Sequence, residues 1–497
     1  MLIDGEHYPP VVAAAVAGLG GAYSVAGGIF AGGREKLRGG GAAAPVLAPA
    51  QSADRSGSAA GLAALAADVG LPWLAAVEPR AASAHETLEG VRAALRAARA
   101  DVLVDLSDEP VVGYRERFLL MSAALAEGAG YVAADTEVRP QAFARLAVTP
   151  SLGVIGTGKR VGKTAVSGWL ARRLDAALRA DGGVVVVAMG RGGPPKPELI
   201  RGGDGLGPAE LLAASRAGRH AASDCYEDAV LAGVTAIGCR RCGGGLAGTP
   251  FDDNVREAIP LVEECAAALA VIEGSGAVVP PLLADATICV AGAGQPADYV
   301  AGYLGTYRLL LSDALVLTQC ELPFVEPGGV EALTAAVRTV RPGIEVVPTV
   351  FRPRPAKPVR GRRVAFFTTA PEGAVPQLVA SLAEDHGAEV VLVSCDLADR
   401  RRLAAAVDRA AAEADVFLTE IKAAAVDVVA EGAAAAGREL VFCDNEPVAL
   451  GGDLAATVDR LAALAAARFA ARRDAAGGER PAGDDRPASA DRPATSE

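Results

Sequence analysis

Short apolar runs alternate with alanine-rich stretches along most of the chain, and this alternation is the main guide to its fold. Val184 to Met189 is a near-continuous run of apolar residues, mostly β-branched, as expected for a parallel strand that is buried on both faces. Repeated alternation of strands and helices predicts an α/β fold with parallel sheets. Further strands are expected at 1–3, 25–30, 101–106, 152–155, 268–272, 287–290, 314–317, 364–367, 390–394, 416–418 and 440–442, and alanine-rich helices at 62–69 and 91–100.

The expected elements fall into three α/β domains. The N-terminal domain covers 1–148, the middle domain 149–355 and the C-terminal domain 356–471. A segment rich in Pro, Arg and Lys, from Pro353 to Arg363, is expected to link the last two domains. The tail 472–497 repeats Arg-Pro-Ala among Gly, Asp and Ser, and we expect it to be disordered.

Composition and charge narrow the classes of partner. The chain of 497 residues is 51% hydrophobic, and its 60 acidic and 48 basic residues give a net charge of −12, which argues against nucleic-acid binding. No apolar run approaches the roughly 20 residues that span a bilayer. The start, MLIDGEHYPP, carries acids where a signal peptide carries bases, so no export signal is expected. Eight scattered cysteines suit reduced thiols in a cytoplasm, and the single C-x-x-C, Cys239 to Cys242, lacks the second Cys/His pair of a structural zinc site.

Residues 151–176 carry the clearest functional motif of the chain. A β-rich run enters a glycine-punctuated loop, which ends in Gly162-Lys163-Thr164 and opens into a helical pattern. In such units the backbone N–H groups of the loop surround nucleotide phosphates, Lys163 reaches the outer phosphates and the Thr164 hydroxyl ligates Mg²⁺. Thr157 stands where the strict pattern has Gly, but strand, loop, Lys-Thr and helix occur in order. We therefore predict a central P-loop NTPase-type parallel sheet domain, with ATP bound by Gly158, Lys159, Arg160, Val161, Gly162, Lys163 and Thr164.

Two acidic positions are candidates for holding Mg²⁺ together with Thr164. Glu273 ends an apolar strand, and an acid at the end of a buried strand downstream of a phosphate loop is the expected metal partner. Asp224 could offer a second metal-directed carboxylate. A helix cap is an equally good interpretation of Asp224, because Asp is a preferred N-cap residue.

Four cations in glycine-rich segments are candidates for binding phosphate groups. Arg191 and Lys196 follow the run that ends at Met189, in a loop that should open near the γ-phosphate. Arg240 and Arg241 lie in what reads as a glycine-rich loop, where Arg side chains and free N–H groups would form a receptor for phosphate oxygens. The alternative for this pair is a flexible turn with two solvated charges.

Polar clusters follow expected strands in both flanking domains, where open parallel sheets place ligand crevices. In the N-terminal domain they are 4–9, 32–36 and 105–110. Each cluster alone is typical of a turn. The three together, at corresponding strand ends, are equally consistent with simple turns and with a functional crevice. In the C-terminal domain they are 419–422 and 443–447, without a glycine-rich loop, so no second nucleotide site is expected. The candidates for substrate contact in the N-terminal domain are His7, Arg34 and Lys36.

Two resemblances add to this picture. The loop from Gly156 to Thr164, with Glu273-Gly274-Ser275-Gly276, is similar to dethiobiotin synthetase and its P-loop relatives over the middle domain. Those enzymes use ATP and Mg²⁺ to phosphorylate an oxyanion. A closer resemblance, covering all but the tail from Arg472, is to the cyclic 2,3-diphosphoglycerate synthetase family. It is carried by Ile3 to Pro9, Gly156 to Ser167, Met189 to Pro195, Gly238 to Gly248 and Glu273 to Gly276.

The closer resemblance implies an ATP-dependent ligase that closes 2,3-diphosphoglycerate into a cyclic phosphoanhydride. One substrate phosphate would attack the γ-phosphorus of ATP, and the other would then displace inorganic phosphate, with no side-chain nucleophile. Two alternatives stay open: a ligase or kinase for another small phosphorylated or carboxylic acid, and a nucleotide-gated switch, for which we find no Asn-Lys-x-Asp segment. The expected partner is a small-molecule acid, with a homodimer as the candidate assembly. The residues expected to neutralise the phosphates are Lys163, Arg191, Lys196, Arg240 and Arg241.

Overall fold

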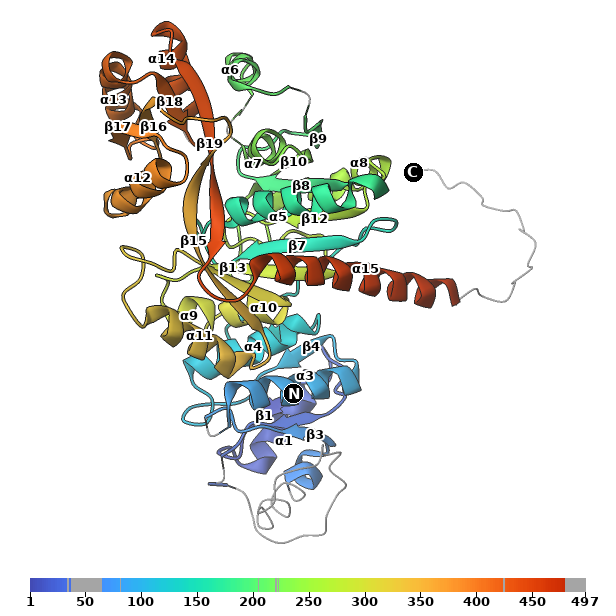
Figure 1. Cartoon of the computed structure of the whole chain (residues 1–497). Coiled ribbons are helices and arrows are strands. Elements are labelled where there is room, and N and C mark those ends of the chain that lie inside the picture. Colours follow the sequence, from blue (N-terminus) through green and yellow to red (C-terminus); the bar gives the residue numbers. More distant parts are fainter. Residues whose placement is uncertain are drawn as a thin grey trace, which may run out of the picture.

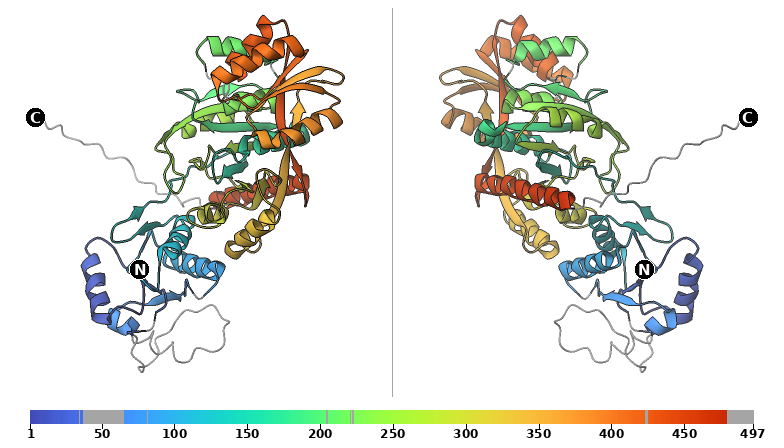
Figure 2. Two further views of the ribbon diagram at one scale, coloured as in Figure 1. Left: turned by 90° about the vertical axis from the view of Figure 1, so that its left-hand side faces the viewer. Right: turned by 90° about the vertical axis from the view of Figure 1, so that its right-hand side faces the viewer.

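The computed structural model describes residues 1–33, 35–36, 65–80, 82–203, 205–219, 221, 223–422 and 425–478. The molecule is elongated, with the N-terminal part at one end, the phosphate-loop part in the middle and the C-terminal strands at the other end (Figure 1). The side views show the same stacking (Figure 2). Its largest element is a 13-stranded sheet that runs through the middle and C-terminal parts, which confirms the predicted α/β class. None of the helices in the described ranges is long and apolar enough to cross a membrane.

The middle part is built on parallel strands around the phosphate-loop strand. β7 (Ser151–Gly156) lies between β12 (Leu269–Glu273) and β13 (Ala286–Gly292), and β8 (Val184–Gly190) pairs with β12. All 7 residues of β8 are buried, as predicted for a parallel strand covered on both faces. The other elements are η1 (Arg179–Asp181), β9 (Glu198–Ile200), α6 (Pro208–Arg216), α7 (Asp224–Glu227), η2 (Asp228–Ala232), β10 (Thr235–Cys242), β11 (Asp252–Asp253), η3 (Val255–Ala258), α8 (Ile259–Glu264), α9 (Ala297–Val300), α10 (Gly305–Leu310), β14 (Ala314–Thr318) and α11 (Gly329–Val340).

Helix α5 (Lys163–Leu178) follows the phosphate loop directly, as the motif predicts. It buries Val166, Leu170 and Leu174 at intervals of four residues, so one face of the helix packs on the sheet. This packing fixes the start of α5 beside the carboxyl end of β7. The phosphate loop is therefore held between two rigid elements.

The N-terminal part contains two small sheets that an isolated bridge connects. β1 (Leu2–Ile3), β2 (Gly28–Phe30) and β3 (Trp73–Ala76) are parallel, and a single bridge joins Leu2 to Asp105 next to the second sheet. The second sheet and the helices are β4 (Val102–Val104), β5 (Gly130–Val132), β6 (Glu137–Val138), α1 (Pro9–Leu19), α3 (Ala84–Ala98) and α4 (Tyr114–Ala126). The three predicted polar clusters lie together at the strand ends: the Asp108 N–H donates to the Asp4 carboxylate at 2.7 Å, and the Gly5 N–H to the Gly32 carbonyl at 2.9 Å.

Strand β15 (Glu345–Pro355) carries the sheet from the middle part into the C-terminal part. Its first residues pair in parallel with β14, and from Thr349 to Pro355 it pairs antiparallel with β19 (Glu439–Ala449). The prediction of a linker from Pro353 is therefore wrong for its first three residues. Beyond Pro348 the strand pairs with only one neighbour, so the missing N–H groups of Pro353 and Pro355 can face the open edge.

The antiparallel step from β15 to β19 reverses the direction of the C-terminal strands. β16 (Arg363–Phe367), β17 (Glu389–Ser394) and β18 (Val416–Thr419) are parallel to one another and to β19. Because β15 extends past the carboxyl edge of the middle strands before it meets β19, the C-terminal strands point their carboxyl ends back toward that edge. The helical segments here are η4 (Glu372–Ala374), α12 (Val375–Glu384), α13 (Arg400–Glu413), η5 (Ala425–Val429) and α14 (Ala430–Ala435).

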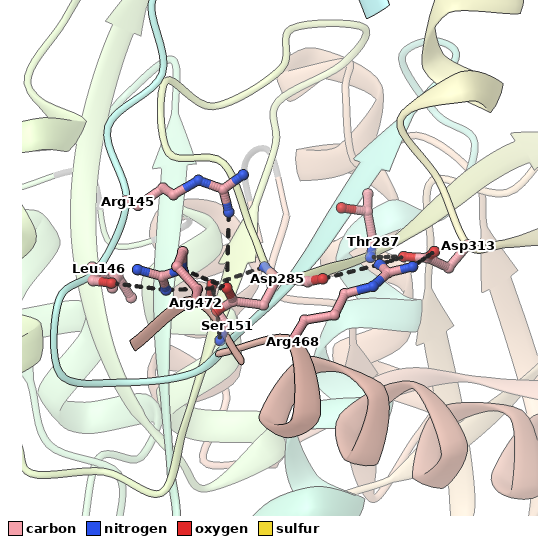
Figure 3. Close-up of polar contacts among 8 residues, drawn as sticks. All are labelled: Arg145, Leu146, Ser151, Asp285, Thr287, Asp313, Arg468 and Arg472. Carbon is pink, nitrogen blue, oxygen red and sulfur yellow. Dashed lines mark hydrogen bonds and ion pairs between the residues drawn. The ribbon is translucent and has the colours of Figure 1, made fainter. Parts of the chain in front are cut away.

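The last helix, α15 (Leu454–Gly478), returns to the middle part and packs against β7, β13 and α5. Near its end, Arg468 donates to the Asp313 carboxylate at 2.8 and 2.9 Å, and Arg472 to the Leu146 carbonyl and to Asp285, both at 3.1 Å (Figure 3). The expectation of disorder from residue 472 is therefore wrong up to Gly478. The reason is that Arg472 belongs to the ion-paired end of this helix rather than to the Arg-Pro-Ala repeats; residues 479–497 lie outside the described part.

Candidate active site

A cavity of about 890 Å³ lies between the middle and C-terminal parts, where the carboxyl ends of their strands face each other. This volume is at the upper end of the range for ligand sites in proteins, so more than one small ligand can fit. The lining includes the phosphate loop and residues of both parts. No described residue of the N-terminal part contributes to it.

The phosphate loop, residues 157–162, forms one wall of this cavity. Within the described part of the chain, none of the N–H groups of residues 158–162 donates a hydrogen bond. The first N–H groups of α5 likewise have no acceptor within the helix. Lys163 begins α5, is only 7% exposed, and its stem lies over Gly156. Free N–H groups and a lysine at a helix N-terminus form a receptor for phosphate oxygens.

The neighbouring strands hold the loop in this shape. The Thr318 hydroxyl donates to the Val161 carbonyl at 2.7 Å, and the Gln319 amide donates to the Arg160 carbonyl at 3.3 Å. Gly162 has a φ of +76°, and a Cβ there would lie 2.2 Å from the ring of Phe351. Glycine is needed at position 162 for both reasons.

Beside the loop, two buried carboxylates lack hydrogen-bond partners. Glu273 is 1% exposed and Asp228 2% exposed, and no oxygen of either side chain has a partner among the described residues. Burial and the nearby charge of Asp224 raise the pKa of Glu273 to about 8, against the opposing effect of Lys163. Burial and the charge of Glu273 raise the pKa of Asp228 as well. This region therefore has an excess of acidic groups and is stabilised by added positive charge.

The acidic residues suit a hard cation that is also bound by phosphate oxygens. Thr164 and Asp224 both line the cavity, and the side chain of Glu273 is close enough to Lys163 for their charges to interact. Ser223, not Asp224, occupies the N-cap position of α7, so the alternative role of Asp224 as a helix cap is wrong. The described residues contain no group of three His, Cys, Asp or Glu that could enclose a metal by themselves. A divalent ion held by a hydroxyl, one or two carboxylates and substrate phosphates fits this donor set.

Two guanidinium groups converge on the other side of the loop, over the turn that follows β12. A Cβ on Gly276 would lie 3.6 Å from Arg241 and 3.7 Å from Arg191. Arg241 is 8% exposed and is held by the carbonyl and hydroxyl of Ser275, at 3.0 and 3.1 Å. Burial lowers the pKa of Arg241, and so does the neighbouring Arg191. Neither guanidinium forms an ion pair with a described carboxylate, so together they favour an anionic ligand.

Comparison with known proteins places the chain in a family. Models of cyclic 2,3-diphosphoglycerate synthetase match it over residues 151–350 (P-loop domain), 355–446 (C-terminal domain) and 65–139 (N-terminal domain). A curated cyclic 2,3-diphosphoglycerate synthetase from Rubrobacter xylanophilus is 49% identical over 453 residues, covering 91% of this chain and 94% of the relative. The chain belongs to the cyclic 2,3-diphosphoglycerate synthetase family.

Further relatives support the same assignment. The curated synthetase of Thermococcus gammatolerans is 41% identical, covering 91% of this chain and 94% of its own length. That of Methanothermus fervidus is 36% identical, covering 90% and 92%. Among solved structures, the hydrogenase maturation factor HypB from Archaeoglobus fulgidus aligns with 41% of this chain and 82% of its own, at 13% identity and a TM-score of 0.26, which is too low to carry an argument.

Three of the predicted phosphate-binding cations, Lys196, Arg240 and Arg241, are not among the residues that line the cavity, although Arg241 lies directly beside the lining residues Ser275 and Gly276. The predicted loop around Arg240 and Arg241 is a strand, β10, as far as Cys242. Side chains alternate along a strand, so Arg240 is exposed on the face opposite Arg241. The same alternation directs the buried Cys239 and the exposed Cys242 to opposite faces, which argues against one metal bound by both. Lys196 is exposed and does not line the cavity.

The predicted substrate contacts of the N-terminal domain also lie outside the cavity lining. The ring of His7 lies 2.8 Å from the Asp4 carboxylate, and Lys36 pairs with Glu35 and lies over the ring of Tyr8. Arg34 is outside the described residues. Substrate binding by these three residues stays a prediction.

The C-terminal domain supplies lining residues for which no role was predicted from the sequence. Lys422, in the turn after β18, lines the cavity and lies 3.5 Å from the Glu227 carboxylate of the middle domain. Although burial opposes it, the carboxylates of Glu227, Glu420 and Asp444 hold the pKa of Lys422 above its usual value. Glu420 in turn accepts hydrogen bonds from the Thr368 and Thr369 hydroxyls, both at 2.7 Å. The predicted polar strand ends at 419–422 and 443–447 were the only sequence signal for this wall.

Proposed function

We propose that this protein is an ATP- and Mg²⁺-dependent ligase that closes 2,3-diphosphoglycerate to cyclic 2,3-diphosphoglycerate, with release of ADP and phosphate. The observation that carries the proposal is the convergence of two arginines at Gly276, beside the phosphate loop: Arg191 and Gly276 line the cavity, and Arg241 lies directly behind Gly276. The relatives that share most of the chain are named for this product. A substrate with two phosphates and a carboxylate needs such cations if it is to approach the triphosphate of ATP.

The residues divide into two binding tasks. Lys163 and the N–H groups of residues 158–164 hold the β- and γ-phosphates of ATP, while Arg191 and Arg241 hold the acid substrate. Mg²⁺, held by Thr164, Glu273 and Asp224 together with phosphate oxygens, supplies charge neutralisation at the transferring group when bound. Arg240 and Lys196, which do not line the cavity, have no contact in this scheme, and substrate contacts from His7, Arg34 and Lys36 stay a prediction.

The first chemical step joins the substrate to the γ-phosphoryl group. An oxygen of one substrate phosphate attacks the γ-phosphorus, the bond between this phosphorus and the β,γ-bridging oxygen breaks, and ADP leaves. Lys163 stabilises the charge that develops on the leaving oxygen, because its ammonium lies at the N-terminus of α5 beside the loop. The product of this step is a diphosphate on the substrate.

The second step closes the ring. An oxygen of the other substrate phosphate attacks the inner phosphorus of the new diphosphate, and inorganic phosphate leaves. Two anionic groups meet in this step, and the guanidinium groups over Gly276 reduce their mutual repulsion. Water has to be kept out, because hydrolysis of the diphosphate would compete with ring closure. The C-terminal wall of the cavity, with Lys422 and Asn445, is placed to exclude it.

The proposal is tested by the acid dependence of ATP turnover. With MgATP and 2,3-diphosphoglycerate, we expect ADP and inorganic phosphate to appear in equal amounts, and little ADP without the acid. A panel of other phosphorylated and carboxylic acids serves as the control. Stronger stimulation by one of these acids would favour the ligase or kinase for another substrate and refute the present assignment. The eight cysteines are free in the structure, which supports our assignment of the enzyme to the cytoplasm.

A further inference from the structure

The two ends of the cavity differ in chemistry. The end beside β8 and β12 carries Arg191, Asp224 and Lys422. The end beside β14 and β15 carries apolar side chains from both domains, Phe324 and Phe351 from the middle part and Pro371, Ala374 and Leu378 from the C-terminal part, next to the single acid Glu372 of the same segment. The phosphate loop lies between the two ends and contributes to both.

The apolar end is directly attached to the phosphate loop. The ring of Phe351 is so close to Gly162 that a Cβ there would lie 2.2 Å from it. Gln319, which directly follows β14 and has a φ of +59°, also lines this end and donates to the Arg160 carbonyl of the loop at 3.3 Å. A ligand whose phosphates fill the loop can therefore extend directly onto Phe351 and Gln319.

The apolar end also lies at the interface between the two domains. Phe324 of the middle part packs against the C-terminal core that contains Ala374 and Leu378. The nearby Glu321 is neutralised by Arg352 through two hydrogen bonds, at 2.5 and 2.9 Å. No free charge of Glu321 therefore opposes an uncharged ring at this end.

We propose that this apolar end binds the purine base of the nucleotide, between Phe351 of the middle domain and the Ala370 to Leu378 segment of the C-terminal domain. The inference rests on the proposed function, because it takes a nucleoside triphosphate to occupy the phosphate loop. The acid substrate cannot be the occupant, since a small polyanion has no apolar surface with which to offset its desolvation against Phe and Leu side chains. A purine has two flat faces suited to aromatic and aliphatic contact, and polar edges within reach of the Gln319 amide.

One consequence is that the base contacts both domains at once. Nucleotide binding then stabilises the packing of the C-terminal domain over the phosphate loop, which brings Lys422 and Asn445 over the reacting groups. The contribution of the base can be separated from that of the phosphates by comparing ATP with inorganic tripolyphosphate. Both ligands fill the loop, and only ATP reaches the apolar end.

The test fills the apolar end without disturbing the loop. Ala370 is half-buried and lines the cavity, so Ala370→Trp places an indole where the base would lie. We expect the Kd of ATP to rise about tenfold to a hundredfold, as loss of one stacked base implies, with the Kd of tripolyphosphate unchanged. Ala434→Trp is the matched control, because Ala434 is exposed on α14 and does not line the cavity. Titration calorimetry measures both ligands.

Two results would overturn the inference. Unchanged ATP binding in Ala370→Trp would mean that the base lies elsewhere, and equal loss of ATP and tripolyphosphate would mean that the loop, not a base contact, was affected. Phe351→Leu is the second variant and should lower ATP affinity alone, by a smaller factor. Formation of the cyclic product by the unmodified enzyme is a separate result, so the base site can fail while the proposed function stands.

Discussion

Arg241→Met is the substitution that best distinguishes substrate binding by Arg241, together with Arg191, from a purely structural role of Arg241. Arg191 and Arg241 each lie less than 4 Å from one point beside Gly276, at 3.7 and 3.6 Å. The two nearest guanidinium nitrogens are then at most about 7 Å apart, a separation at which two unit charges repel by roughly 2 kcal/mol at an effective dielectric constant of about 20. Solvent around the exposed Arg191 screens part of this. An anion bound between the two arginines is attracted by both of them, which offsets their mutual repulsion. Loss of either arginine therefore lowers the affinity for the acid substrate.

The expected effect is on the acid rather than on ATP. Removing one preorganised donor of this kind costs about 10²- to 10³-fold, so kcat/KM for 2,3-diphosphoglycerate should fall by that factor. The KM for ATP should change less than about fivefold, the size of effect expected for a charge that does not touch the nucleotide. Initial rates of ADP release at varied acid and varied ATP measure both quantities. Arg241→Lys should recover only part of the loss, because lysine cannot reproduce the fork held by Ser275.

The chain offers a matched control in the adjacent residue. Arg240→Met removes the same charge from the opposite, exposed face of β10, and its kinetics should stay close to those of the unmodified enzyme. Equal losses in the two variants would refute the geometric argument, and so would an equal rise in KM for ATP and for the acid in Arg241→Met. Circular dichroism and thermal unfolding establish that both variants are folded.

Three further substitutions test other parts of the account. Lys163→Ala should abolish nucleotide turnover, measured as ADP release, and leave the Tm nearly unchanged, because Lys163 forms no ion pair with a described residue; retained turnover would contradict the loop assignment. Lys422→Met should lower the free energy of unfolding in urea by about 1–2 kcal/mol, a modest loss because the ion pair of Lys422 with Glu227 is partly exposed. Adding Glu227→Gln should restore part of this loss, and an unchanged stability of the single variant would contradict the role of the pair. Arg472→Ala should lower the free energy of unfolding by about 1–3 kcal/mol, because it leaves the buried Asp285 with fewer partners. Arg473→Ala, at an exposed position, should leave the stability unchanged, and equal Tm values for the two variants would contradict the anchoring of α15.

The local part of the site could be predicted from the sequence because its signals are short in range. The strand, glycine-rich loop and helix around Lys163 are consecutive in the chain, and the apolar run before Glu273 marks a buried strand whose acid follows directly. The β-branched run of β8 likewise predicted its burial. Each of these inferences needs only a few neighbouring residues and one general rule.

The boundary between strand and loop was harder to predict at Arg240 and Arg241. The glycines after Cys242 favour a loop, but β10 continues through both arginines because it pairs with β8 on one side and β9 and β11 on the other. Pairing of this kind depends on distant segments, and it decides which arginine faces the site. A loop would have allowed both arginines to reach it.

The second wall of the cavity could not be predicted, because it results from the reversal between β15 and β19. Only that antiparallel step directs the carboxyl ends of the C-terminal strands toward the phosphate loop. Polar strand ends such as Glu420 and Lys422 were visible in the sequence, but their position opposite Asp224 was not. The return of α15 to the middle domain also depends on contacts between residues far apart in the chain, such as Arg472 with Asp285.

Phosphorus NMR of the purified protein with MgATP and 2,3-diphosphoglycerate shows directly whether the enzyme forms a cyclic phosphoanhydride. We expect the two phosphomonoester resonances of the substrate to be replaced by phosphoanhydride resonances of a cyclic product, with matching amounts of ADP and inorganic phosphate, and we expect none of these changes with Lys163→Ala. Consumption of ATP with the 2,3-diphosphoglycerate resonances unchanged, or an unaltered reaction in Lys163→Ala, would contradict the proposed function.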